Sequence, residues 1–340
     1  MARFGARTAV GIREVRSMSE RQKVSLYIPC YNGEEYIAAC IEGVLNQFRK
    51  PDEIFVIDDG STDRTAEIAE NYPQVTVIRH EKNKGLAAAR NTAIAASTGD
   101  YIASLDADCV ADKLWLYTLL QVMKTMPETV GGIGGKLIEA FQDTPADAFR
   151  AHFMCQHKGD EPVLNPGFVA GANTMFRRNA LFAVGGYHEA FRTNGEDVQV
   201  CRKMQQMGFT VVYEPRATVQ HQRQDSIASV VRMNWAHWRH PMAIVDPVTT
   251  LRRAVKRAWM RASYCTQMIR AIWRAKEWRF LKIGFRCLVV TPFWEVREWW
   301  RIKRDDLTEQ YEQRAKAAMT FRPVSPDDPH SLVEPLSQNS

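Results

Sequence analysis

The feature that most constrains this chain is a regular alternation of short apolar segments with helical periods between residues 24 and 105. Residues 24–28, 54–57, 75–78 and 101–105 are rich in β-branched and aromatic side chains, which predicts strands. The segments 35–46, 63–71 and 86–96 between them carry apolar residues at helical spacing. Strands and helices that alternate in this way build a parallel sheet covered on both faces, so the sequence predicts an α/β fold.

Acidic side chains follow two of these predicted strands, Asp58 and Asp59 after the second and Asp106 and Asp108 after the fourth. The carboxyl ends of parallel strands meet at one edge of a sheet, where open α/β sheets bind their ligands. Residues two apart in an extended segment share a side, so the carboxylates of Asp106 and Asp108 can converge on one hard cation. A cation there would bridge a substrate diphosphate and neutralise its charge as it leaves. Helix capping or turn formation is the alternative for each pair taken alone.

The pattern between residues 130 and 221 is mixed. Residues 131–137 are rich in glycine, 168–176 predict a strand, and 195–207 predict a helix that Gly208 ends. Residues 210–213 predict a strand that stops at Pro215. The glycines at 131–135 lack the spacing of a dinucleotide-binding fingerprint. The loops 139–168 and 185–196, which have no readable pattern, are expected to shape the ligand pockets.

Six short motifs occur in a fixed order along the first two thirds of the chain. They are Val-Ser-Leu-Tyr-Ile-Pro-Cys-Tyr-Asn-Gly-Glu-Glu (24–35), Asp-Asp-Gly-Ser-Thr-Asp (58–63), Asn-Lys-Gly-Leu-Ala-Ala-Ala-Arg-Asn (83–91), Leu-Asp-Ala-Asp (105–108), Gly-Ala-Asn-Thr-Met-Phe-Arg-Arg (171–178) and Gly-Glu-Asp-Val (195–198). Together they resemble the family 2 inverting glycosyltransferases over residues 24–222. The resemblance implies the GT-A nucleotide-diphospho-sugar transferase fold, a mostly parallel central sheet with helices on both faces, here followed by a C-terminal helical appendage.

The resemblance also implies which residues bind a nucleoside diphosphate sugar, the donor. Pro29 and Tyr31 match positions that line the base pocket, and Asp59 matches the acid that accepts a hydrogen bond from the nucleobase. Lys84 and Arg90 lie where basic groups approach the nucleotide, although a solvated helix face is the alternative. The full set expected to contact the donor is Pro29, Tyr31, Glu34, Asp58, Asp59, Lys84, Arg90 and Asp106.

The same resemblance implies a divalent metal. Asp106 matches the acid near the ribose and the metal, and Asp108 matches the direct metal ligand. The family uses Mg²⁺ or Mn²⁺, which agrees with the preference of these ions for oxygen ligands. His221 lies where some relatives have a residue that contacts the metal or the diphosphate, and a structural histidine is the alternative.

Asp197 matches the catalytic base of the family. In an inverting transfer the acceptor hydroxyl attacks the anomeric carbon opposite the diphosphate, and a carboxylate takes the hydroxyl proton. Glu196 is expected to steer the acceptor or to substitute as the base. Both acids also precede a predicted helix, where negative charge is favoured, so capping is the alternative for either residue.

A basic region rich in tryptophan follows the motifs. Residues 223–304 contain eighteen Lys and Arg against five Asp and Glu, together with eight of the nine tryptophans. One apolar stripe at helical spacing comprises Ile227, Val230, Val231, Asn234, Trp235 and Trp238. A second predicted helix has one face of Trp278, Leu281, Phe285, Leu288 and Val289 and another face of Arg279, Lys282 and Arg286. Such helices suit peripheral contact with an anionic membrane, and packing on the core or in a homodimer is the alternative. Nucleic acid is not expected, because no binding motif is present.

These patterns divide the chain into a flexible basic leader (1–23), a GT-A catalytic domain (24–222), a basic helical region (223–320) and a disordered tail (321–340). The leader lacks the apolar run of a secretory signal. The apolar segment 280–294 has about fifteen residues where a membrane span needs about 20, and Lys282 and Arg286 interrupt it. Seven scattered cysteines favour a reducing compartment. We therefore expect a cytoplasmic protein, peripheral on the inner face of the cell membrane.

The sequence as a whole predicts a metal-dependent inverting glycosyltransferase that moves one sugar to a lipid-linked or other saccharide acceptor. Processive synthases of the family carry a Gln-x-x-Arg-Trp motif, which Arg232-Met-Asn-Trp235 matches only weakly. A sugar nucleotidyltransferase is one alternative, but it needs a glycine-rich, Arg-containing loop after the first strand. A non-catalytic nucleotide-sugar or membrane-binding module is the other.

Overall fold

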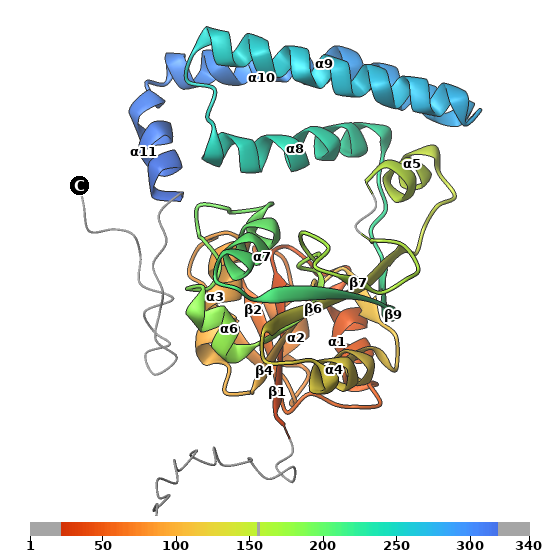
Figure 1. Ribbon diagram of the computed structural model, residues 1–340, viewed down its shortest axis with the longest axis vertical. Coiled ribbons are helices and arrows are strands. Elements are labelled where there is room, and N and C mark those ends of the chain that lie inside the picture. Colours follow the sequence, from red (N-terminus) through yellow and green to blue (C-terminus); the bar gives the residue numbers. More distant parts are fainter. Residues whose placement is uncertain (1–21, 155–156, 319–340) are drawn as a thin grey trace, which may run out of the picture.

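The computed structural model describes residues 22–154 and 157–318. The predicted tail, and all of the predicted leader except residues 22 and 23, lie outside the described residues. Figure 1 shows a core built around a sheet, with a layer of helices stacked on one side of it.

The first half of the sheet is parallel, as the alternating pattern predicts. It consists of β1 (Val24–Cys30), β2 (Glu53–Asp58), β3 (Thr76–Arg79) and β4 (Tyr101–Leu105), in the spatial order β3-β2-β1-β4. The intervening helices are α1 (Ile37–Leu45), α2 (Thr65–Glu70) and α3 (Leu86–Ala96). Every residue of β1 is buried, because this strand lies inside the sheet and is covered on both faces.

The second half extends the sheet through β8, β6, β9 and β5, and antiparallel pairings make the whole sheet mixed. These strands are β5 (Cys109–Ala111), β6 (Val130–Glu139), β7 (Val163–Leu164), β8 (Asn173–Arg177) and β9 (Thr210–His221). The helices of this half are α4 (Trp115–Thr125), α5 (Pro145–Phe153), α6 (Arg178–Ala183) and α7 (Glu196–Gln206). The predicted α/β fold class is confirmed.

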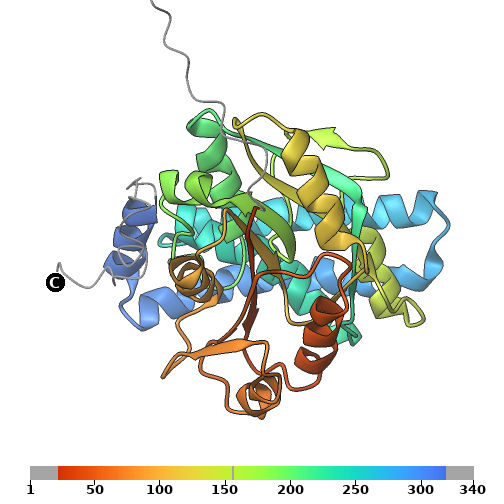
Figure 2. The same ribbon diagram turned by 90° about the horizontal axis from the view of Figure 1, so that it is seen from below.

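Two apolar clusters cover the two faces of the sheet. One joins alternate residues of the strands to α1 and α4, with Trp115 completely buried in it. The other joins the remaining strand residues to α3, α6 and α7. Figure 2 shows the helices on both sides of the strands. Strand side chains alternate between the faces, so both clusters depend on the same strands.

The prediction that a strand ends at Pro215 was wrong, because β9 continues to His221. The register between β6 and β9 shifts at this point: Gly135 pairs with Glu214, and the next pair joins Lys136 to Thr218. The residues 215–217 therefore form a bulge, where proline does not have to donate a ladder hydrogen bond.

The basic region folds as α8 (Ile227–Val245), α9 (Leu251–Arg274), the short 3₁₀ turn η1 (Trp278–Phe280), α10 (Leu281–Arg304) and α11 (Thr308–Ala318). α9 and α10 form an antiparallel hairpin, and α8 lies between this hairpin and the core (Figure 1). A third apolar cluster joins α8 and the hairpin to α5, and it includes Phe149, Val230, Met268 and Ile283.

The predicted separation of apolar and basic faces on α10 was wrong. Phe285 and Val289 are exposed together with Lys282 and Arg286, whereas the buried residues are Ile283, Gly284, Cys287, Thr291, Glu295, Glu298 and Ile302. α9 packs against this side of α10, where Gly284 lies next to Ile269 and Ile272. Within the described parts of the chain, no helix is long and apolar enough to cross a membrane.

The close approach of β6 to the bulge of β9 predicts a severe effect for Gly135→Ala. A Cβ at this position would meet the backbone oxygen of Ala217 at 1.9 Å and the amide of Asn173 at 2.6 Å. We expect a loss of about 2 kcal/mol or more in the free energy of unfolding, measured by urea denaturation. In the control Gly43→Ala, the added methyl meets the movable Val110 side chain at 3.3 Å, so the loss is smaller. Equal stability of Gly135→Ala and the unmodified protein would contradict this account.

Candidate active site

The strand register brings the predicted acids to one edge of the sheet. Asp58, the last residue of β2, pairs with Cys30 at the end of β1, and Asp106 follows directly on β4 at the other side of β1. Adjacent strands lie about 4.8 Å apart, so the two acidic segments are about 10 Å from each other.

The loop after β1 is tied to the loop after β2. Asn32 has a positive φ of 50°, its N–H donates to Ser61 Oγ, and its side-chain oxygen accepts from the N–H of Thr62. Glu34 accepts a hydrogen bond from the N–H of Arg64, and its own N–H donates to Asp63. Pro29 is buried beneath this loop, whereas the Tyr31 side chain is 51% exposed. Glu34 thus fixes the loops, and Tyr31 is free to contact a ligand.

Asp59 holds the loop that leads into α3. Its carboxylate accepts hydrogen bonds from the backbone N–H groups of Lys84 and Gly85 at 2.8 and 2.7 Å, and from Nδ1 of His80 at 2.7 Å. Burial raises the pKa of Asp59, but these three hydrogen bonds outweigh burial and lower it below the ordinary value. No sequence pattern pointed to His80, because its pairing with Asp59 depends on the register of β2 and β3. The Lys84 side chain is exposed.

Asp58 has a different role from its neighbour. It is completely buried, accepts from the N–H of Ser61 at 2.9 Å and forms an ion pair with Arg79 of β3 at 3.0 Å. It therefore stabilises the turn that follows β2.

Arg90 is buried beneath the site and does not lie on a solvated helix face. Its guanidinium donates to the backbone oxygen of Gly171 at 2.8 Å, to Ser104 Oγ at 2.9 Å and to Asp106 Oδ1 at 3.0 Å. It also lies 3.7 Å from Glu196 Oε1. Arg90 is thus the cation that joins the end of β4 to the segment before β8 and to the start of α7.

Asp106 and Asp108 are the candidate metal ligands, and their side chains are 30% and 28% exposed. Burial raises the pKa of Asp106, and repulsion from Asp108 and Asp197 adds to this effect, although Arg90 opposes it. This mutual repulsion is what a bound divalent cation would relieve, so the donor set fits Mg²⁺ or Mn²⁺. No group of three or more potential ligands is preassembled among residues 22–154 and 157–318. A cation held by one or two carboxylates takes its other ligands from substrate phosphates and water.

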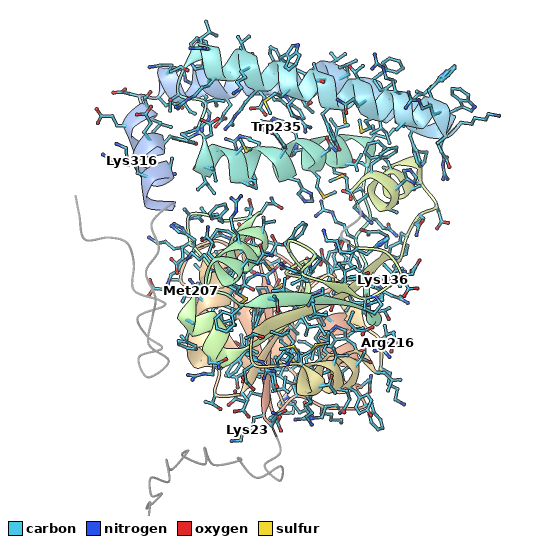
Figure 3. All side chains as sticks on the ribbon, in the orientation of Figure 1. Lys23, Lys136, Met207, Arg216, Trp235 and Lys316 are labelled. Carbon is cyan, nitrogen blue, oxygen red and sulfur yellow. The ribbon has the colours of Figure 1, made fainter. Side chains whose placement is uncertain are left out.

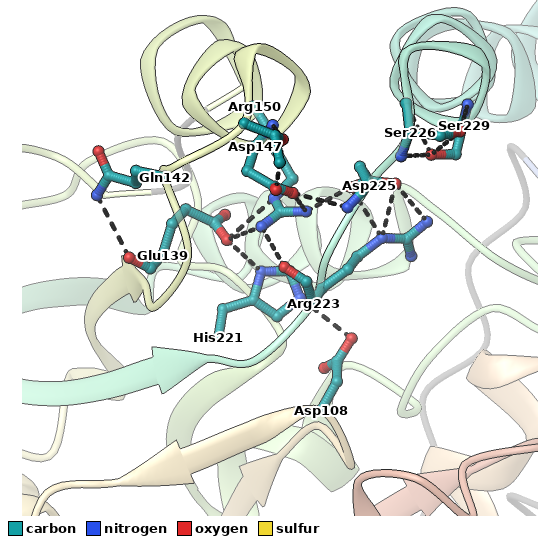
Figure 4. Close-up of polar contacts among 11 residues, drawn as sticks. Asp108, Glu139, Gln142, Asp147, Arg150, His221, Arg223, Asp225, Ser226 and Ser229 are labelled. Atoms are coloured by element: carbon teal, nitrogen blue, oxygen red, sulfur yellow. Dashed lines mark hydrogen bonds and ion pairs between the residues drawn. The ribbon is translucent and has the colours of Figure 1, made fainter.

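His221 bridges Asp108 to a buried network that the sequence did not reveal (Figure 4). Its Nε2 donates to Asp108 at 3.1 Å and its Nδ1 donates to Glu139 at 2.9 Å. Burial lowers the pKa of this imidazole, but the two carboxylates outweigh burial and raise the pKa to about 9. The arrangement follows from the sheet, because β9 lies between β5 and β6 and pairs His221 with Cys109 and Glu139.

The network continues from Glu139 to the start of the helical region. Arg150 of α5 donates from Nε to Glu139 at 3.0 Å and also pairs with Asp225. Asp225 accepts from Arg223, and its N–H donates to Asp147 of α5 at 2.6 Å (Figure 4). Charged groups therefore connect Asp108 to the segment that begins α8.

Glu196 and Asp197 begin α7, but they occupy different environments. Glu196 is 3% exposed, and burial together with repulsion from Asp197 raises the pKa of Glu196 to about 8, although Arg90 opposes the shift. Asp197 is partly exposed and accepts a hydrogen bond from the N–H of Gly171 at 3.2 Å. Of the two carboxylates, that of Asp197 is the one open to solvent.

α8 contacts the loop in front of α7. His240 of α8 bonds to Thr193 and lies 3.2 Å from the side-chain amide of Asn194. A Cβ on Gly195 would meet the ring of Pro241 at 2.7 Å. The helical region thus covers the candidate catalytic acids on one side.

A mixed sheet that collects carboxylates at the end of β4, beside a helix that begins with two acids, defines a GT-A glycosyltransferase. One solved structure with a similar fold is the mannosyltransferase PcManGT from Pyrobaculum calidifontis in complex with GDP-Man and Mn²⁺. It superposes with a TM-score of 0.52 and 18% sequence identity over 88% of this chain and 85% of that chain, which shows the fold.

Residues 25–184, which are 160 of the 340 residues, match the family model described as Glycosyl transferase family 2, and this segment belongs to that family. It is 26% identical over 216 residues to a glucosyl-dolichyl phosphate glucuronosyltransferase of Haloferax volcanii, covering 58% of this chain and 69% of that protein. It is also 26% identical over 267 residues to a poly-beta-1,6-N-acetyl-D-glucosamine synthase of Staphylococcus aureus (strain COL). That match covers 76% of this chain and 64% of the synthase, so the chain spans less than two thirds of that relative's length.

The buried position of Glu196 predicts a pH-dependent stability. Its folded-state pKa is about 8, above the ordinary value of 4.5, so its contribution is fully present below pH 4.5 and is lost as the pH rises through 8. Glu196→Gln removes the ionisation, and we expect this variant to be more stable than the unmodified protein by about 1 kcal/mol or more at pH 8.5. The difference should vanish below pH 5. Urea denaturation across this range, with the exposed Glu81→Gln as the control, would contradict the prediction if both variants behaved alike.

The His221 bridge predicts a shift in its titration when one carboxylate is neutralised. In Glu139→Gln, the imidazolium keeps Asp108 but loses the charge on the Nδ1 side, so its pKa should fall by about 1 unit or more from the value of about 9. NMR titration of the histidine ring signals in metal-free protein measures this change. Glu128→Gln is the control, because the Glu128 side chain is 80% exposed and lies in another ion pair. An unchanged His221 titration in Glu139→Gln would rule out the bridge.

Proposed function

We propose that this protein is a metal-dependent, inverting glycosyltransferase that moves a single sugar from a nucleoside diphosphate sugar to a lipid-linked or other saccharide acceptor. The observation that carries the proposal is the convergence of Asp106, Asp108 and Asp197: burial raises the pKa of Asp106, and the charges of the other two acids raise it further. Three carboxylates placed together at the ligand-binding edge are suited to a cation, a leaving diphosphate and a proton.

The donor side of the proposal rests on the two tied loops at the ends of β1 and β2. Tyr31 is exposed beside them, and Asp59 orders the backbone N–H groups of Lys84 and Gly85. We infer that the nucleoside lies over these loops and that Asp59 accepts a hydrogen bond from the base. Arg90 holds Asp106 and the Gly171 carbonyl oxygen in position without facing the ligand.

In the proposed transfer, Asp197 accepts the proton of the acceptor hydroxyl while that oxygen forms a bond to the anomeric carbon. The bond between the anomeric carbon and the diphosphate oxygen breaks with its electron pair, so the nucleoside diphosphate leaves and the configuration inverts. Mg²⁺ or Mn²⁺ bound by Asp108 and Asp106 would neutralise negative charge on the departing diphosphate. Glu196, buried behind Asp197, keeps the start of α7 next to Arg90.

The sugar belongs to the hexosyl or N-acetylhexosaminyl class in this proposal. Support comes from the names of the similar proteins, which refer to glucuronosyl transfer, to N-acetyl-D-glucosamine and to GDP-Man. A role in cell-envelope polysaccharide synthesis at the cytoplasmic face of the membrane would supply both the donor and a lipid-linked acceptor.

Substitution of the acids tests the proposal directly. Asp197→Asn should lower turnover by about 10² to 10⁴ while donor binding persists, because only the proton acceptor is lost. Asp108→Asn should abolish turnover and also remove the increase in melting temperature that Mn²⁺ and the donor produce together. A panel of nucleotide sugars is screened by thermal shift, and product configuration is read by NMR. Asp305→Asn, exposed in the helical region, is the control. Full turnover in both site variants would refute the mechanism.

A further inference from the structure

The hairpin of α9 and α10 exposes an unusual amount of apolar surface. Ten of the nineteen large apolar side chains that the described residues expose lie between residues 251 and 304. They are Leu251, Val255, Trp259, Tyr264, Trp273, Trp278, Phe285, Val289, Phe293 and Trp300. The other nine are spread over the rest of the described chain, so the exposed apolar surface is concentrated on this one element.

On α10 the exposed residues form one stripe that combines apolar and basic side chains. Phe285, Val289, Phe293 and Trp300 follow one another at spacings of four, four and seven residues, which places them on one side of a helix. Their exposed fractions are 53%, 72%, 64% and 53%. The exposed basic residues of the same stripe are Lys282, Arg286, Arg297 and Arg304.

α9 presents a similar stripe. Val255, Trp259 and Trp273 are 55%, 71% and 65% exposed. The exposed basic residues beside them are Arg252, Lys256, Arg270 and Arg274. Each 24-residue helix is about 36 Å long, so the two stripes together form an elongated surface.

The carboxylates of the hairpin helices point in the opposite direction. α9 contains no Asp or Glu, and the two acids of α10, Glu295 and Glu298, are 0% and 7% exposed. Glu295 accepts a hydrogen bond from Trp235 Nε1 of α8 at 2.9 Å, and Glu298 pairs with Arg239 of α8. Figure 3 shows Trp235 between α8 and the hairpin. The exposed stripes therefore lie away from α8 and carry only positive charge.

We propose that the exposed face of the α9–α10 hairpin, hereafter the hairpin face, docks on the surface of a bilayer that contains anionic lipids. The aromatic and aliphatic side chains enter the boundary between headgroups and acyl chains, and the flanking Lys and Arg contact lipid phosphates. Arg304 pairs with Asp305 just beyond α10, but neither stripe itself contains an acid. A protein partner is disfavoured by this dense basic charge around the apolar residues, whereas an anionic bilayer complements both features at once.

Docking through this face leaves the catalytic edge of the sheet on the side of α8 that faces away from the hairpin. His240 and Pro241 of α8 contact the loop before α7, so a docked hairpin fixes the candidate catalytic acids relative to the bilayer. The inference stands independently of the proposed sugar transfer, because membrane contact requires neither the donor nor the metal.

Vesicle co-sedimentation of the full chain tests the proposal. Vesicles of phosphatidylcholine mixed with phosphatidylglycerol should bind the protein at low salt, and vesicles of phosphatidylcholine alone should bind it at least about tenfold more weakly. Raising the salt to about 1 M shortens the Debye length to about 3 Å and should release most of the protein. Equal binding to both kinds of vesicle, or no binding to either, would overturn the proposal.

Two sets of substitutions identify the face. The apolar variant Trp259→Ser/Val289→Ser/Phe293→Ser and the charge variant Lys256→Glu/Lys282→Glu/Arg286→Glu should each reduce partition by at least about tenfold. The matched control is Phe48→Ser/Leu164→Ser. These two side chains are exposed to a similar extent, 66% and 68%, but they lie outside the helical region. Circular dichroism and thermal melting confirm that every variant is folded. Retained vesicle binding in both hairpin variants would overturn the assignment.

A second copy of the chain is the competing occupant of the hairpin face. Analytical ultracentrifugation would then show a dimer that the apolar variant dissociates, with no vesicle binding, and this outcome refutes the membrane proposal. Nucleotide release in the presence of a soluble saccharide acceptor is measured on the same proteins. Intact vesicle binding without any turnover would count against the proposed function alone, whereas intact turnover without vesicle binding would count against the hairpin face alone.

Discussion

The site depends on holding several carboxylates close together at one edge of the sheet. Burial raises the pKa of Asp106, and repulsion from Asp108 and Asp197 raises it further, so the fold has to supply positive charge before any ligand arrives. Buried Arg90 does this for Asp106, and His221 does it for Asp108. Both cations are also anchored elsewhere, Arg90 on the Gly171 carbonyl and His221 on Glu139, so they fix the backbone as well as the charge. A divalent cation would therefore bind carboxylates that Arg90 and His221 already hold in position.

A chain of ion pairs that starts at His221 also connects the core to the helical region. Glu139 offsets the charge of His221, Arg150 of α5 offsets Glu139, and Asp225 completes the chain just before α8 begins. A second connection is made by His240, which contacts the loop before α7. The helical region is therefore part of the architecture of the site, and its inner and outer faces have separate chemistry. The inner face buries acids and pairs them, and the outer face exposes aromatic and basic residues.

Local sequence patterns were sufficient for the parallel half of the sheet and for the placement of its acids. A run such as Ile54–Asp58 is apolar until the strand ends, and a carboxylate follows where the chain leaves the sheet. The predictions from local patterns were wrong where contact with another element decided the structure. The bulge in β9 accommodates Pro215, and contact between α9 and α10 buries Ile283 and Cys287 while leaving Phe285 and Val289 exposed. In both cases another element decides the outcome, β6 for the bulge and α9 for the buried side of α10.

The sequence by itself determined the family resemblance, the α/β core and the positions of the candidate acids, because these follow from motifs and periods within short windows. The partners of those acids were decided only by the tertiary structure. His221 meets Asp108 and Glu139 because β9 is inserted between β5 and β6. Arg90 meets Asp106 because α3 packs on β1 and β2, and β1 is the neighbour of β4. Periodicity specifies which side of a strand or helix a residue occupies, but only the packing of elements specifies which charge lies opposite it.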